Sequence, residues 1–130
     1  MGKYFNSVSL FISSFGGGIA YLLGGWDALA KSLLILMCID YLSGVLKALY
    51  SKNLSSQIGL KGIIRKVFIL LIVCCSAVAE RVLGVQMARE MIVCFFIANE
   101  MLSIIENGVE IGAPVPEWLK QALLQIRNKK

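Results

Sequence analysis

Four long apolar segments fill most of the sequence and limit what the chain can fold into. They cover residues 4–26, 28–50, 63–83 and 88–107. A helix needs about 20 residues to cross the hydrocarbon core of a bilayer, so each segment is long enough to span a membrane. Charged residues make up only 16% of the chain, against about 25% in soluble domains. The sequence therefore predicts an all-α integral membrane protein, built of helical hairpins with three or four transmembrane helices.

The first segment leaves the number of spans open. It carries no charge from Tyr4 to Trp26, but it contains five glycines, which weaken a helix in water and are better tolerated in membrane helices. Short turns at 24–27 and 84–87 predict antiparallel neighbours, with Asp27 as the N-cap of the second helix. Residues 51–62 are predicted to form a polar, basic loop. Together, residues 1–112 are predicted to form one transmembrane domain.

Residues 113–130 have a different character and are predicted to form a basic amphipathic tail. Pro116 suits the first position of a helix. Apolar residues then recur on one helical face: Trp118, Leu119, Ala122, Leu123 and Ile126. A helix of this kind is expected to lie on the cytoplasmic leaflet, with its apolar face in the membrane interface.

The basic residues predict the orientation. With four spans, ten of the 13 Lys and Arg residues fall on the side of both termini, and only Lys31, Arg81 and Arg89 fall on the other. The positive-inside rule then places the C-terminus in the cytoplasm, whether or not the first segment spans. We expect contacts with anionic lipid headgroups from Lys52, Lys61, Arg65, Lys66, Lys120, Arg127, Lys129 and Lys130.

Two acidic residues lie near the middle of predicted spans. Asp40 and Glu100 are each about 18 Å from the outer end of their helices, at 1.5 Å per residue. A charge at that depth costs about 2.5–3.5 kcal/mol on the insertion scale. No basic residue is expected at this level, since Lys47 lies about two turns nearer the cytoplasm. The two acids are therefore predicted to be protonated, hydrogen-bonded across helices or exposed to water.

Polar and small residues accompany both acids at helical spacing. The predicted helix-interface or pore-lining residues are Asp40, Ser43, Gly44 and Lys47 on one helix, and Asn99, Glu100, Ser103, Glu106 and Asn107 on another. Small residues allow helices to approach closely, and polar residues bond across the contact. A static contact inside a bundle and a wall that becomes wet are both compatible with this pattern.

The sequence lacks the residue patterns of the common catalytic sites. The chain has no His, which excludes His-based zinc sites and Ser–His–Asp triads. The Gly16–Gly18 run lacks the following Lys that a phosphate loop needs. We therefore predict no catalytic residues, no metal and no cofactor. The basic loop is better explained by membrane topology than by nucleic-acid binding.

Several motifs in order resemble the toxin-secretion/phage-lysis holin family of Gram-positive bacteria and their phages. They occur at 25–27 (Gly-Trp-Asp), 40–48 (Asp-Tyr-Leu-Ser-Gly-Val-Leu-Lys-Ala), 54–56 (Leu-Ser-Ser), 59 (Gly), 61–63 (Lys-Gly-Ile), 65–66 (Arg-Lys), 98–100 (Ala-Asn-Glu), 102–104 (Leu-Ser-Ile), 106–108 (Glu-Asn-Gly), 112 (Gly) and 114–116 (Pro-Val-Pro). The resemblance runs from about residue 24 to residue 123, and the Gly-rich stretch before it carries less of the family's signal.

This resemblance implies a protein of the bacterial cytoplasmic membrane that accumulates harmlessly and then oligomerises into lesions. A cell-wall hydrolase (an endolysin) or a large toxin would leave through them. Two other functions stay open from the residues alone: a small proton-coupled transporter or ion channel, which also uses membrane acids, and a small lipid-modifying membrane enzyme. Only the holin would release a folded cytosolic protein.

Overall fold

The computed structural model describes residues 2–129, without the side chain of Arg127, and the described part of the chain is entirely helical. The five helices are α1 (Gly2–Leu22), α2 (Ala28–Tyr50), α3 (Ser56–Leu83), α4 (Ala88–Glu110) and α5 (Glu117–Asn128). The first four are long and apolar enough to cross a membrane. The predicted all-α membrane architecture is therefore confirmed, with a short helix following the four candidate spans.

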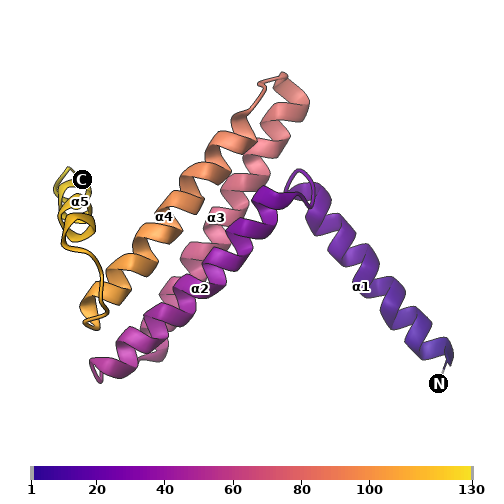
Figure 1. Cartoon of the computed structure of the whole chain (residues 1–130). Helices are drawn as coiled ribbons and strands as arrows, with labels where there is room; N and C mark the ends of the chain where they lie inside the picture. The colour runs from indigo at the N-terminus through magenta and orange to yellow at the C-terminus, as the bar shows by residue number, and fades with distance from the viewer. Residues whose placement is uncertain (1, 130) are drawn as a thin grey trace.

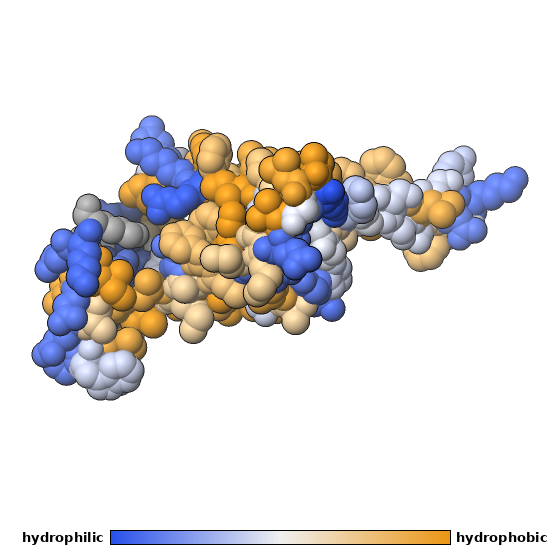
Figure 2. Space-filling model, turned by 90° about the horizontal axis from the view of Figure 1, so that it is seen from above, coloured by the Kyte–Doolittle hydropathy of each residue, from blue (hydrophilic) through white to orange (hydrophobic). Residues whose placement is uncertain are grey.

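Helices α2, α3 and α4 form a bundle in which α3 runs antiparallel to the other two, and α4 packs chiefly against the parallel α2 and then against α3 (Figure 1). Its core is a small apolar cluster made of Leu23, Leu33, Met37, Ile69, Val73 and Val93. Most of the remaining large apolar side chains point outward. Figure 2 shows this apolar surface over the bundle, with hydrophilic residues concentrated near the chain ends. Such a surface is suited to hydrocarbon rather than to water.

Helix α1 leaves the bundle at an angle and extends away from it (Figure 1). Within the described part of the chain it buries none of its own residues, and it meets the bundle through a limited contact with α3. Exposed aromatic residues on α1 include Tyr4, Phe5, Phe11 and Phe15. The position of α1 is therefore set at its C-terminal end, where the chain turns into α2.

Local capping explains where the helices begin and end. The Asp27 side chain accepts a hydrogen bond from the Ala30 N–H at 2.9 Å, so the predicted N-cap of α2 is confirmed. Gly84 ends α3 in the left-handed conformation, with φ of +65°. Ser55 caps α3 through the Gln57 N–H.

The cap at Ser55 corrects one predicted boundary. Helix α3 begins at Ser56 rather than at residue 63, so the segment containing Lys61 is helical and not part of a loop. The polar composition of 56–62 concealed this extension, because a hydropathy pattern does not register a helix end that projects beyond the apolar layer. Helix α4 likewise continues to Glu110, beyond the predicted end at 107.

The C-terminal tail contains the predicted helix, as α5. It contacts α4 and buries Leu123, while Trp118 stays exposed. Its placement on a membrane surface remains a prediction. The predicted lipid contacts of the Arg127 side chain and of Lys130 fall outside the described residues.

Two leucines on α2 test the packing of the core. Leu33 is 1% exposed, and Leu42 is 59% exposed on the same helix. We expect Leu33→Ala to reduce the free energy of unfolding by about 2–5 kcal/mol, because it leaves a cavity. Leu42→Ala is the matched control and should have a much smaller effect. Reversible unfolding in mixed detergent micelles measures both, and equal losses would contradict the assignment of the core.

Candidate functional site

A buried ionic cluster joins the three bundle helices. The Lys66 ammonium on α3 donates to Asp40 Oδ2 on α2 at 2.6 Å and to Glu100 Oε2 on α4 at 2.5 Å. The side chains of Lys66 and Asp40 are each 15% exposed, and that of Glu100 is 3% exposed. One ammonium is thus shared between two carboxylates within the bundle. We call Asp40, Lys66 and Glu100 the central cluster.

Neutral polar groups extend the central cluster toward the end of α4. Asn107 Nδ2 donates to Ser43 Oγ at 2.8 Å and lies 3.4 Å from Asp40 Oδ1. Gly44 lies beside this contact, and a Cβ there would be in ordinary van der Waals contact with Asn107 Nδ2, at 3.8 Å. The structure therefore brings Asp40, Ser43, Gly44, Glu100 and Asn107 together at one helix interface.

The prediction that no basic residue reaches the depth of the two acids is wrong. Lys66, predicted to contact lipid headgroups, instead turns inward to them. It lies ten residues after Ser56, about 15 Å along α3 from its first residue. Its long side chain bridges the remaining distance, and the carboxylates offer a stronger partner than hydrocarbon does. Asp40 and Glu100 were predicted to be protonated, hydrogen-bonded across helices or exposed to water. In the structure both accept hydrogen bonds from another helix.

The energetics of the central cluster depend on its completeness. A charge in a medium of low dielectric is costly unless a partner and hydrogen bonds compensate it. Here two acids share one base, so removing Lys66 would leave two carboxylates close together without a cation. Removing both carboxyl charges would leave Lys66 unpaired in the same way. The cluster ties α2, α3 and α4 into one arrangement.

The other residues predicted for this interface lie elsewhere. Lys47 approaches Glu110 at 3.4 Å in a partly exposed ion pair. Ser103 and Glu106 are half-buried on α4. Asn99 does not join the central cluster and lines a groove between α3 and α4.

The predicted headgroup contacts also have defined positions. Lys52, Lys61, Arg65 and Lys129 are exposed, and Lys120 is half-buried, 3.7 Å from Glu117. The contact of these residues with lipid headgroups stays a prediction.

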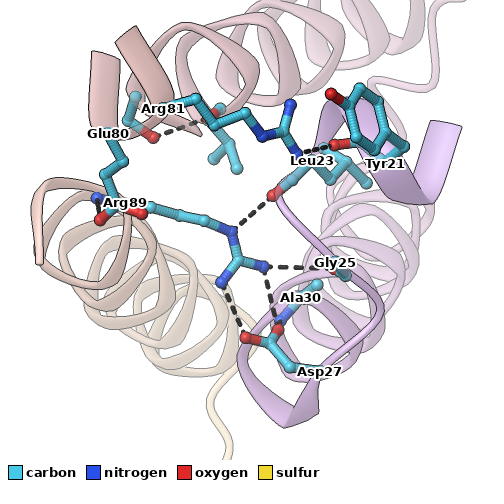
Figure 3. Close-up of polar contacts among 10 residues, drawn as sticks. Tyr21, Leu23, Gly25, Asp27, Ala30, Glu80, Arg81 and Arg89 are labelled. Carbon is cyan, nitrogen blue, oxygen red and sulfur yellow. Dashed lines mark hydrogen bonds and ion pairs between the residues drawn. The ribbon is translucent and has the colours of Figure 1, made fainter. Parts of the chain in front are cut away.

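A second ionic cluster lies where α1 meets the bundle, and Figure 3 shows its polar contacts. The buried Arg89 guanidinium on α4 donates to both carboxylate oxygens of Asp27, at 2.7 and 3.0 Å. It also donates to the backbone carbonyls of Leu23 at 2.5 Å and Gly25 at 3.3 Å. Its own backbone N–H donates to Glu80 Oε1 at 2.9 Å. We call this group the hinge cluster, because it fixes the turn between α1 and α2.

Arg81 provides a further attachment of α1 to α3. Its guanidinium donates to the Tyr21 carbonyl and lies 4.0 Å from the centroid of the Tyr21 ring. Gly24, with φ of +86°, completes the turn, and a Cβ there would collide with Arg89 Cδ and Nε. Two arginines therefore take carbonyl groups at the end of α1 that have no partner within the helix.

The sequence analysis missed the hinge cluster. It placed Arg81 and Arg89 only as outer basic residues, although Asp27 and Arg89 both lie at short turns on that side. The opposite charges of Asp27 and Arg89 at these two turns were the sequence signal that could have predicted their ion pair. The backbone carbonyls that complete the cluster carry no signal in the sequence.

The hinge cluster also determines the ionisation of Asp27, which precedes the α2 span. The hydrogen bond from Arg89 lowers the pKa of the Asp27 carboxyl from 3.8 to about 2, with a smaller lowering contribution from the Ala30 N–H, and partial desolvation opposes this shift. Asp27 therefore stays ionised, and its pairing with Arg89 is retained well into the acid range.

Comparison with known families identifies the chain's family. The model of the bacteriophage holin family matches residues 17–128. The chain belongs to the bacteriophage holin family. This result confirms the resemblance found from the sequence motifs, and members of this holin family are non-enzymatic membrane proteins.

Individual relatives match most of the length of the chain. A Clostridium perfringens protein, named as an uncharacterized 14.9 kDa protein in the nagH 3' region, is 42% identical over 132 residues and all of both chains. The probable holin of Bacillus phage phi105 is 36% identical over 110 residues, which cover 84% of this chain and 81% of the relative. The Bacillus subtilis protein YqxH is 39% identical over 111 residues, 85% of this chain and 79% of the relative. No solved structure matches the chain.

The central cluster can be tested by removing its only base. We expect Lys66→Met to reduce the free energy of unfolding by about 3–5 kcal/mol, because it leaves buried carboxylates without a cation. Adding Asp40→Asn and Glu100→Gln should restore much of that stability, since no charge then remains in the cluster. The control is Lys61→Met, which removes an exposed lysine of the same helix. Equal unfolding curves for Lys66→Met and Lys61→Met in detergent micelles would contradict the cluster.

The hinge cluster predicts a dependence on acid pH. The folded-state pKa of Asp27 lies below its ordinary value, so its charge contributes stability in full above about pH 4 and loses it as the pH falls toward about 2. Asp27→Asn keeps a side chain that can cap α2 but removes the charge. The difference in unfolding free energy between the original protein and Asp27→Asn should therefore shrink between these pH values. A difference that does not change with pH would argue against the ion pair.

Proposed function

We propose that this chain acts as a holin that oligomerises in the bacterial cytoplasmic membrane and opens lesions. A cell-wall hydrolase, or a large toxin, would leave the cytoplasm through them. Its functional partners would be further copies of itself, an endolysin or toxin released through the lesion, and anionic lipids at the cytoplasmic surface. Membership of the holin family and the multi-pass membrane architecture support this proposal.

The central cluster is the observation that carries the mechanism. In a single bundle, the three charged side chains satisfy one another away from lipid. If copies rearrange so that the faces of α2 and α4 line an opening, water can solvate Asp40, Lys66 and Glu100 instead. Pairing within the bundle and solvation by water both compensate the three charges, whereas exposing the same groups to hydrocarbon costs several kcal/mol per charge.

This difference makes the change cooperative. A bundle that opened alone would turn charged groups toward lipid, but several bundles opening together share one aqueous space. Packed helices have few arrangements of similar free energy, so the change is between discrete states. A delay followed by sudden opening is then expected as the density of copies in the membrane rises.

The proposed orientation places the C-terminus in the cytoplasm. The α2–α3 turn and the C-terminal end of α4 lie at the same end of the bundle, opposite the hinge cluster (Figure 1). The exposed residue Lys52 belongs to the α2–α3 turn at that end. An excess of basic residues on the cytoplasmic side is the usual determinant of membrane orientation.

Lysis in a bacterium tests the function directly. The chain is expressed from an inducible promoter, with and without a co-produced wall hydrolase that has no export signal. We expect an abrupt loss of turbidity, with release of a folded cytosolic reporter enzyme, only when both proteins are present. Continued growth with both proteins would contradict the holin function, and release of ions without the reporter would indicate a small channel instead.

A charge-neutral variant tests the role of the central cluster. Asp40→Asn, Lys66→Met and Glu100→Gln together should preserve the bundle but remove the groups that favour a wet opening, so lysis should be delayed or lost. Lys31→Met is the control, because it removes an exposed lysine of α2 that belongs neither to the cluster nor to the predicted pore-lining residues. Accumulation in the membrane is measured for each variant by immunoblotting. Normal timing in the triple variant would contradict the proposed mechanism.

A further inference from the structure

Helices α3 and α4 flank an open groove that neither ionic cluster uses. It has a volume of about 470 Å³. Residues of α3 from Lys61 to Ile72 form one side, over about 16 Å of helix axis at 1.5 Å per residue. Phe96 and Asn99 of α4 form the other. The groove therefore runs along the membrane-spanning part of the bundle rather than across it.

The two basic residues of the groove lie together at one end of it. Lys61 and Arg65 are four residues apart on α3, and both are exposed. Among the described residues, neither forms a salt bridge, whereas Lys47, Lys66, Arg89 and Lys120 each pair with a carboxylate. Two adjacent cations without carboxylate partners form a site that is complementary to a phosphate group.

The rest of the groove is largely apolar. Ile64, Phe68 and Ile72 recur every four residues along α3, and the buried Ile69 lies beside them. Phe96 faces them from α4. The apolar part of the groove begins beside the two cations and continues into the span. An acyl chain extends from a lipid headgroup into the bilayer in the same way.

Asn99 is the one polar residue on the α4 side of the groove. It is half-buried, and among the described residues its side chain has no hydrogen-bond partner that belongs to the protein. An amide in hydrocarbon needs a partner, because leaving it unpaired costs free energy. Asn99 precedes Glu100 in the sequence, so this amide lies at about the depth of the central cluster, on the acyl-chain part of the groove.

We propose that the groove between α3 and α4 is a binding site for one anionic phospholipid. The phosphate binds Lys61 and Arg65, and an acyl chain lies along Ile64, Phe68, Ile72 and Phe96. The next residue after Arg65 is Lys66, which turns to the opposite side and enters the central cluster. A lipid held here therefore fixes the segment of α3 that positions the central cluster, and it stabilises the closed bundle.

The binding experiment uses the full chain in phosphatidylcholine bilayers that contain spin-labelled phosphatidylglycerol or spin-labelled phosphatidylcholine. Electron paramagnetic resonance measures the fraction of labelled lipid that the protein immobilises. The original protein should prefer phosphatidylglycerol. Lys61→Gln with Arg65→Gln should reduce this preference by about fivefold for each cation removed.

Two matched controls separate a site from general surface charge. Lys3→Gln with Lys31→Gln removes two exposed lysines that lie outside the groove and outside the predicted headgroup contacts, and it should preserve the preference for phosphatidylglycerol. An equal loss in both double variants would overturn the site and indicate diffuse attraction. Ile72→Trp should fill the groove and release the immobilised lipid, whereas Leu71→Trp, at an exposed neighbouring position, should not. Equal immobilisation in the two Trp variants would show that no acyl chain occupies the groove.

The result is independent of the lysis experiment. If the protein prefers phosphatidylglycerol but does not cause lysis, the lipid site is supported and the holin function is contradicted. If it causes lysis but shows no difference between the two labelled lipids, the holin function is supported and the lipid site is contradicted. Circular dichroism of each variant verifies that the helices are intact.

Discussion

The cost of an unpaired charge in hydrocarbon is the constraint on which this structure depends. Lys66 meets it by donating to Asp40 and Glu100, so that one side chain connects three helices. The apolar core of the bundle is small, and lipid tails are as apolar as the side chains that would pack there, which weakens the hydrophobic drive for association. Polar contacts therefore have a larger part in selecting one bundle arrangement than they have in a soluble protein.

The same principle operates at the opposite end with different groups. Arg89 uses Asp27 together with the Leu23 and Gly25 carbonyls, so it binds side-chain and backbone groups at once. The result is a fixed turn from which α1 extends with its apolar surface uncovered by the rest of the chain (Figures 1 and 3). Three helices are thus held as a unit, while the fourth candidate span is attached mainly by its end.

Much of the fold could be predicted because the bilayer imposes simple requirements. The presence of four helices long enough to span a membrane, the N-cap at Asp27 and the turn at Gly84 all follow from local composition and spacing. The start of α3 could not be predicted in the same way, because residues 56–62 mix polar residues and glycines with only two apolar side chains, and a helix end outside the apolar layer has no clear hydropathy signal. Asp40 and Glu100 were identified by their depth, but Lys66 was placed at the surface, since its position along α3 does not reveal which way its side chain turns.

The sequence by itself determined that the chain is helical, that four of its segments can span a membrane, and that two acids near mid-span require an explanation. These properties depend on residue type and on distance along the chain. Only the tertiary structure decided which partners those acids have, that Arg89 secures the turn after α1, and that Asn99 faces a groove rather than the central cluster. Such contacts depend on the rotation of each helix about its axis and on backbone carbonyls, and packing sets both only when all the helices are assembled.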